Sequence, residues 1–214
     1  MRFVALFLAS SAALVAVGAP PVLAADPPSA PAVTVPTYEN ATCPIMGRPT
    51  SRVLFADTNY GRVYVCCPPC IAKIKADPER AYKTAYPVNV KAENKVCPIT
   101  GEAVPADGPR VVLQGHEIGL CCAGCVAKAK SHAQVVLVKV LRPGTTDVGN
   151  GTCPITGKPV TANVFCLVGN DLIRLFAPAN VDDVKKDPAK ALKDAKDIAA
   201  KEAAAKKAAE SNPK

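Results

Sequence analysis

Apolar and polar residues alternate along the chain in three similar stretches, each with two short apolar segments separated by a polar turn. The segments are four or five residues long and rich in Val, Leu and Ile, which is typical of the strands of a β-hairpin. The expected strand pairs are residues 52–55 with 62–65, 110–113 with 117–120, and 163–167 with 172–175. The chain is therefore expected to contain three β-hairpins.

Each second strand is followed by a segment with helical composition, and these segments cover residues 68–76, 123–131 and 177–186. The first and third are followed by Asp77-Pro78 and Asp187-Pro188, which suit an Asp N-cap with Pro at the first position of a further helix. Residues His132-Ala133 occupy this place in the second stretch. The pattern predicts an α+β fold of three tandem small modules, each a β-hairpin followed by one or two helices.

A repeated pentapeptide sets the register of the three modules. It reads Cys43-Pro44-Ile45-Met46-Gly47, Cys97-Pro98-Ile99-Thr100-Gly101 and Cys153-Pro154-Ile155-Thr156-Gly157. Such self-similarity indicates repeated structural units. We expect repeat 1 at 42–95, repeat 2 at 96–150, a degenerate repeat 3 at 151–190, and an Ala/Lys-rich helix or tail at 191–214.

The first 24 residues have the pattern of a secretory signal peptide. Arg2 precedes an apolar or small-residue run over 3–19, and Val22-Leu23-Ala24 supplies small residues at the two positions that the cleavage enzyme reads. An uncleaved membrane anchor is the alternative interpretation. After cleavage, a Pro/Ala-rich linker at 25–41 would lead to the modules, with no membrane span left. The expected location is periplasmic or secreted, where thiols are bridged, metal-bound or kept reduced.

Ten cysteines in 214 residues carry the candidate chemistry. Repeats 1 and 2 each hold one leading Cys followed, after 22 or 23 residues, by a Cys-Cys-x-x-Cys run. These candidate metal ligands are Cys43, Cys66, Cys67, Cys70, Cys97, Cys121, Cys122 and Cys125. Folding of the hairpin would bring the leading Cys to the point where the second strand enters a helix. The helix dipole is expected to lower the pKa of thiols at that helix start.

This spacing resembles the TRASH domain, and an apolar residue before Cys-Cys-x-x-Cys, followed by Lys-x-Asp-Pro, resembles the related YHS domain. Repeat 1 matches through Cys43, Cys66, Cys70 and Asp77-Pro78; repeat 2 matches through Cys97, Cys121 and Cys125. The resemblance implies treble-clef-like modules that bind a soft metal such as Cu(I) or Zn(II) through Cys. Repeat 3 departs from it, with Phe176 and Asn180 at the places of Cys66 and Cys70, so we expect no metal site of this kind there.

The number of ligands does not decide between Cu(I) and Zn(II). A structural Zn(II) site needs four ligands, and the position where a zinc knuckle places its second thiol is Met46, Thr100 or Thr156. Three thiolates with Met46 nearby suit Cu(I), whereas four thiolates suit Zn(II). The count stops at three unless Cys67 or Cys122 turns inward, because consecutive strand residues point to opposite faces.

The hypothesis drawn from these features is an exported protein that binds, buffers or transfers a soft metal and is not an enzyme. One alternative is a disulfide-stapled module that presents a surface to an envelope protein partner, and another is a CxxC thiol-disulfide redox protein. The net charge is +8, but part of it lies in the Lys-rich tail and aromatic residues are few, so nucleic-acid binding is not expected. Asn40-Ala41-Thr42 and Asn150-Gly151-Thr152 match glycosylation acceptors, which is weak evidence.

Overall fold

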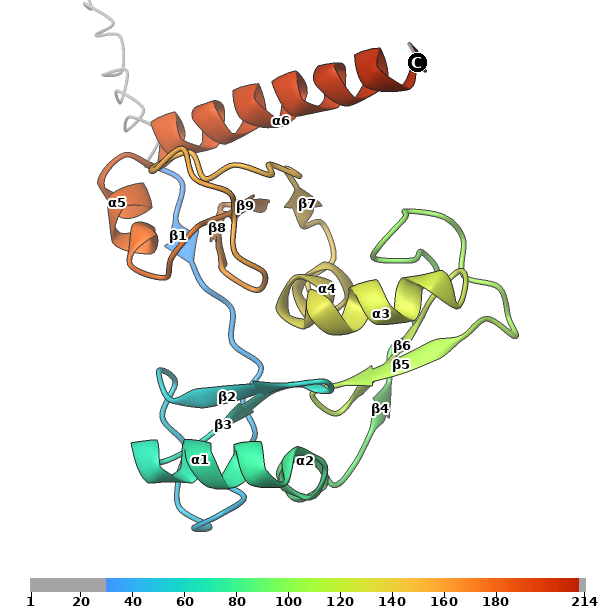
Figure 1. The fold of residues 1–214 in the computed structure, drawn as a ribbon, viewed down its shortest axis with the longest axis vertical. Coiled ribbons are helices and arrows are strands. Elements are labelled where there is room, and N and C mark those ends of the chain that lie inside the picture. Colours follow the sequence, from blue (N-terminus) through green and yellow to red (C-terminus); the bar gives the residue numbers. More distant parts are fainter. Residues whose placement is uncertain (1–29, 212–214) are drawn as a thin grey trace, which may run out of the picture.

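The structure is a computed structural model that describes residues 30–211. It confirms the α+β class: the described residues form three small sheets and six helices, arranged as three hairpins that are each followed by two helices. In Figure 1 the first module lies at the bottom, the second at the right and the third at the upper left. No helix among the described residues is long and apolar enough to cross a membrane.

The hairpins form where apolar residues alternate along the chain. Their strands are β2 (Phe55–Thr58) with β3 (Gly61–Tyr64), β5 (Arg110–Leu113) with β6 (His116–Gly119), and β8 (Phe165–Val168) with β9 (Asp171–Arg174). The second and third hairpins lie within two residues of the predicted positions. The predicted hairpins are thus present in all three modules.

The first strand of the first hairpin lies three residues later than expected. Residues 56–58, at the start of the expected turn, belong to β2. Ala56 is buried there, while Asp57 faces solvent and pairs with Arg62 across the hairpin. The actual turn is shorter. The Thr58 hydroxyl donates to the Gly61 carbonyl and accepts from the Tyr60 N–H. This side chain thus forms hydrogen bonds with two backbone groups of the turn.

The six helices follow the hairpins in pairs. They are α1 (Pro68–Ala76) and α2 (Pro78–Ala85), α3 (Gly124–Ser131) and α4 (Ala133–Leu141), and α5 (Asn180–Lys186) and α6 (Pro188–Glu210). The predicted Asp-Pro starts are confirmed: Asp77 and Asp187 are N-caps whose side chains accept from the N–H groups of Arg80 and Lys190. Helix α4 begins after His132 without a side-chain cap.

Short strands extend two of the hairpins. Strands β4 (Val90–Lys91) and β7 (Thr146–Asp147) pair in parallel with β6 and β9, and each lies seven residues before the leading Cys of its module. Strand β1 (Val33–Thr34) pairs antiparallel with β8 of the third module. Part of the segment interpreted as a linker is therefore a strand that ties the start of the described chain to the third module.

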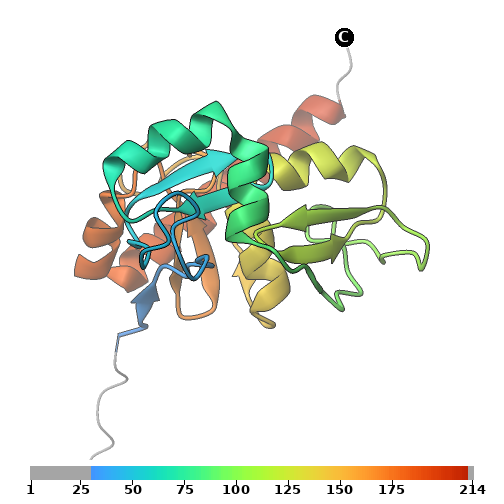
Figure 2. The ribbon, with the colours of Figure 1, turned by 90° about the horizontal axis from the view of Figure 1, so that it is seen from below.

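Helix α4 joins the second and third modules. Val136 and Leu137 pack into the core of module 2, while Val135 and Val138 pack against Phe165 and its neighbours in module 3. Figure 1 shows α4 between the two modules, and Figure 2 shows the same neighbours from below. Burial on both faces explains why a run rich in β-branched residues is helical here.

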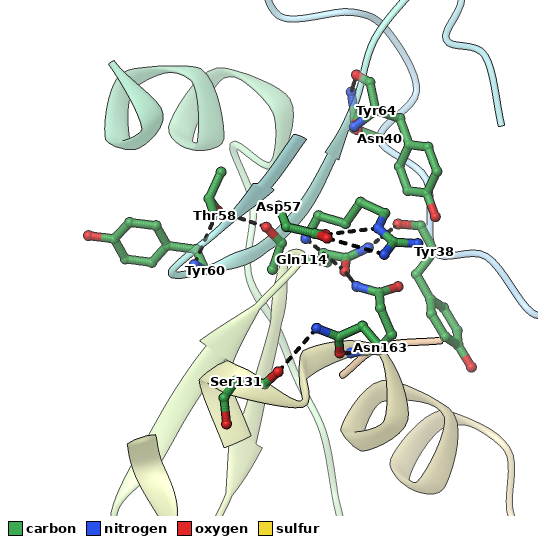
Figure 3. A network of polar contacts seen from close by, with 12 residues as sticks. Tyr38, Asn40, Asp57, Thr58, Tyr60, Tyr64, Gln114, Ser131 and Asn163 are labelled. Atoms are coloured by element: carbon green, nitrogen blue, oxygen red, sulfur yellow. Dashed lines mark hydrogen bonds and ion pairs between the residues drawn. The ribbon is translucent and has the colours of Figure 1, made fainter. Parts of the chain in front are cut away.

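A polar junction links the first module to the other two (Figure 3). The Gln114 side chain accepts from the Arg62 N–H at 3.1 Å and donates to the Tyr38 carbonyl at 2.5 Å. It also accepts from the Gln134 side chain, and the Gln134 N–H donates to Asn163 of module 3. Because Gln114 and Gln134 are almost fully buried, these bonds fix how the modules meet.

Candidate metal centres

Each CPI[MT]G pentapeptide forms the same tight turn. The Gly N–H bonds to the carbonyl of the leading Cys at 2.8 to 2.9 Å, and the Cys N–H bonds at 2.8 Å to the carbonyl of the residue after the Gly. The glycines have φ values of 65°, 81° and 67°, a region that favours Gly over residues with a side chain. The repeated sequence therefore encodes a turn that holds the leading cysteine at its base.

An asparagine three residues before each leading cysteine ties this turn to the end of the second strand. The residues are Asn40, Asn94 and Asn150, and each accepts from a strand N–H through Oδ1 and donates to the same strand residue's carbonyl through Nδ2. Nδ2 also donates to the carbonyl of the residue just before the cysteine. The strand residue lies two positions before Cys66, Cys121 or Phe176, so the amide sets the leading turn against the Cys-Cys run.

This role is not apparent from any one repeat, although the three repeats together carry a signal for it. Asn40 and Asn150 match glycosylation acceptors in the sequence, whereas the structure buries both, at 2% and 0% exposure. Alignment of the three pentapeptides would have placed an Asn at the same position in every repeat, including Asn94, which no glycosylation pattern explains. An invariant position within one chain indicates a common structural task.

The turn and the hairpin end bring three sulfur atoms together in each of the first two modules. The Sγ atoms of Cys43, Cys66 and Cys70 all lie within 4.8 Å of one another, and so do those of Cys97, Cys121 and Cys125. The leading Cys and the last Cys of each set are buried, with 1% and 2% exposure, and the middle Cys is half-buried. Three thiols at this spacing could hold a soft metal ion.

The fourth cysteine of each set lies at the rim of the cluster. Cys67 Sγ is 3.4 Å from Cys70 Sγ and 3.7 Å from Cys66 Sγ, and Cys122 Sγ is 3.6 Å from Cys125 Sγ and 3.8 Å from Cys121 Sγ. The two cysteines of a pair do not point to opposite faces, because the strands end at Tyr64 and Gly119, before each pair begins. Only one cysteine of each pair nevertheless joins the group of three that contains the leading cysteine, which is the expected count. All eight predicted ligands thus lie in or beside a cluster.

The leading cysteines are the thiols that ionise most readily. Burial raises the pKa of Cys43, but hydrogen bonds from the Cys66 N–H and from two N–H groups of its own turn outweigh burial and lower the pKa to about 7. The corresponding donors, with help from the Thr100 hydroxyl, lower the pKa of Cys97 to about 6. Convergent backbone N–H groups of this kind form a small anion-binding nest.

The expected effect of the helix start on the trailing cysteines is wrong for Cys70 and Cys125. Burial and the neighbouring thiols raise the pKa of both to about 12. The pKa of Cys67 and of Cys122 is lowered, mainly by hydrogen bonds from the adjacent cysteine sulfurs. Within each cluster the first negative charge therefore settles on the leading sulfur and opposes ionisation of the last one.

The third module keeps the turn but not the cluster. Burial raises the pKa of Cys153, but donors of its turn, including the Thr156 hydroxyl, and the Phe176 N–H lower it overall. Phe176 is 38% exposed beneath Lys158, and the Asn180 side chain accepts from the Ala177 N–H at the start of α5. Neither replacement supplies a thiol, and Cys153 belongs to neither cluster of the described residues.

Comparison of the chain with protein-family models, with curated proteins and with solved structures finds no match. The likeness to TRASH and YHS domains consequently rests on the cysteine spacing. The two clusters are compatible with a cysteine-rich metal-binding domain.

Replacement of Asn94 tests whether the repeated asparagine holds the turn against the hairpin. Asn94→Ala leaves the Gly119 N–H and carbonyl without their partner, and we expect a loss of about 2 kcal/mol in unfolding free energy. The measurement is urea unfolding of the reduced, metal-free full chain. Asn59→Ala, at an exposed turn position, is the control and should change stability by less than about 0.5 kcal/mol. Equal midpoints for the two variants would refute the assignment.

The low pKa of Cys97 makes the stability of the reduced, metal-free chain depend on pH. Between about pH 6 and pH 9 the folded state holds Cys97 as thiolate while the unfolded state keeps the proton, so stability increases with pH in this window. It is lost as the pH falls through about 6. The unfolding free energy of the wild type should therefore rise more steeply from pH 6 to pH 9 than that of Cys97→Ser. Parallel curves would contradict the thiolate assignment.

Proposed function

We propose that this chain is an exported protein that binds a soft metal, Cu(I) or Zn(II), through the cysteine clusters of its first two modules, and that it buffers or transfers this metal outside the cytoplasm. The observation that carries the proposal is the convergence of three Sγ atoms within 4.8 Å in each module. Export is supported by the signal-like pattern of residues 1–24, which lie outside the described residues.

Three properties of the clusters support metal binding over a chance gathering of thiols. The same arrangement is built twice, from sequences that share little besides the turn and the cysteines. Each cluster contains one thiol with a low pKa, and a ligand must be deprotonated before it binds a metal. The remaining thiols can ionise when the charge of a bound cation compensates the repulsion between them.

The donor set favours a soft ion and leaves both candidates open. A three-thiolate site is complete for Cu(I), whereas Zn(II) needs a fourth ligand, which Cys67 or Cys122 is placed to give. The two modules differ at the position after the Pro-Ile step. The Thr100 hydroxyl lies 3.2 Å from Cys121 Sγ, while module 1 has the thioether of Met46 at this position, half exposed.

A stapled module without metal is the competing function, and one experiment separates it from the proposal. Elemental analysis is combined with free-thiol counting on the full chain recovered from the compartment to which it is exported. We expect one metal ion per cluster, hence two per chain, and a full set of thiols once the metal is removed. Substoichiometric metal with no free thiols would instead favour the disulfide-stapled protein.

Variants locate the metal within the chain. Cys43→Ser and Cys97→Ser should each cost one tightly bound equivalent, because each takes away the buried leading thiol of one cluster. Cys153→Ser is the matched control, since it changes the same turn in the module that lacks a cluster. A Cys153→Ser chain that loses metal would show that the third module had been misjudged.

A further inference from the structure

Each of the first two modules contains a second triangle of sulfur atoms beside the one already described. In module 2 the Sγ atoms of Cys121, Cys122 and Cys125 are separated by 3.6, 3.6 and 3.8 Å. In module 1 Cys67 Sγ lies 3.7 Å from Cys66 Sγ and 3.4 Å from Cys70 Sγ. We call this set the outer triangle, and the set containing the leading cysteine the inner triangle.

The two triangles share an edge. In module 2 the sulfurs of Cys121 and Cys125 belong to both, and the third corner is Cys97 on one side and Cys122 on the other. Module 1 has the same arrangement, with Cys66 and Cys70 shared. An ion could therefore move between the triangles while two of its three sulfur ligands stay attached.

The two triangles differ in solvent exposure, and the outer one lies nearer to solvent. Cys122 is exposed and Cys121 is half-buried, whereas Cys125 and Cys97 are 2% and 1% exposed. A donor or acceptor molecule in solution can thus approach an ion in the outer triangle but not one that sits against Cys97. In module 1 the rim residue Cys67 is half-buried, so access there is narrower.

We propose that the outer triangle is a second metal position, through which a soft ion such as Cu(I) enters and leaves the inner triangle by exchange of one thiolate. This inference rests on the proposed function. On entry, the bond between the ion and Cys122 Sγ breaks as a bond to Cys97 Sγ forms, and Cys121 and Cys125 remain bound. Each sulfur keeps its electron pair and the ion keeps its oxidation state. Cys97 enters the bond as a thiolate and Cys122 leaves it as a thiolate, so the exchange needs no net transfer of protons.

This arrangement explains why the run is Cys-Cys-x-x-Cys in both modules. Two cysteines with this spacing, added to the leading one, would suffice for a three-thiolate site. Cys67 and Cys122 lie at the rim, and neither belongs to the group of three sulfurs that contains the leading cysteine. Their positions suit a ligand that is used during transfer and released afterwards.

The test measures the rate and the equilibrium of Cu(I) release from one module at a time. In the Cys70→Ser background of the full chain, module 1 has lost a sulfur that both of its triangles share, so only module 2 keeps its two triangles. The chain is loaded with one Cu(I) under anaerobic conditions and mixed with a coloured Cu(I) chelator in a stopped-flow instrument. Loss of one assisting ligand in the rate-limiting step should slow release by about tenfold or more in Cys122→Ser.

The equilibrium affinity should behave in the opposite way. Cys122→Ser leaves the inner triangle intact and should change the Kd for Cu(I) by less than about threefold, or about 0.7 kcal/mol. Cys97→Ser in the same background is the matched control. It keeps the outer triangle, so its release should be at least as fast as that of the parent, with a Kd weaker by about 100-fold.

Two results would overturn the inference and leave the proposed function standing. One is an unchanged release rate in Cys122→Ser; the other is an affinity loss in Cys122→Ser as large as that in Cys97→Ser, which would make Cys122 a permanent fourth ligand. A parent chain that takes up neither Cu(I) nor Zn(II) would overturn the proposed function itself. If Cys122→Ser fails to fold by circular dichroism, the measurement is repeated on module 1, as Cys67→Ser in the Cys125→Ser background, which breaks both triangles of module 2.

Discussion

The repeated asparagine amide, buried at Asn40 and Asn150 and partly buried at Asn94, is the contact on which the candidate centres depend. It joins two pieces of backbone that are about 20 residues apart, the leading turn and the end of the second strand, through three hydrogen bonds at 2.8 to 3.1 Å. A small module has little apolar core with which to fix such a loop. The amide performs this task in all three modules, and the cysteines can then meet at a defined point.

Thiolates in each cluster would repel one another, and a bound cation would reduce this repulsion. Backbone donors favour a thiolate at Cys43 and Cys97, while burial and that first charge raise the pKa of Cys70 and Cys125. Three thiolates in one buried place repel one another unless a positive ion lies between them. The third module has the turn and its donors without this repulsion, because Phe176 and Asn180 replace the other sulfurs. The third module instead anchors two other elements. Strand β1 pairs with its strand β8, and Glu202 of α6 accepts from the Gly151 N–H and the Thr152 hydroxyl beside the third turn.

Much of the architecture could be predicted from the sequence, because the pentapeptide repeat fixes the register and alternating apolar residues identify the hairpins. The Asp-Pro starts of α2 and α6 were also predictable, since the capping interaction is local. Strand β2 was misplaced because its polar Asp57 and Thr58 suggest a turn when their partner strand is unknown. The asparagine contacts, the joint core around α4 and the junction at Gln114 depend on residues distant in sequence. The helix-dipole argument for Cys70 and Cys125 failed because burial, which outweighs it, is visible only in the folded chain.

The central claim is that three cysteine sulfurs in each of the first two modules surround one metal ion. X-ray absorption spectroscopy of the metal-loaded full chain tests it most directly, because it reports the type and number of atoms bound to the metal. The structure predicts a shell of about three sulfur atoms for Cu(I), or about four at roughly 2.3 Å for Zn(II). A shell made up mainly of nitrogen or oxygen atoms in place of these sulfur atoms would contradict it.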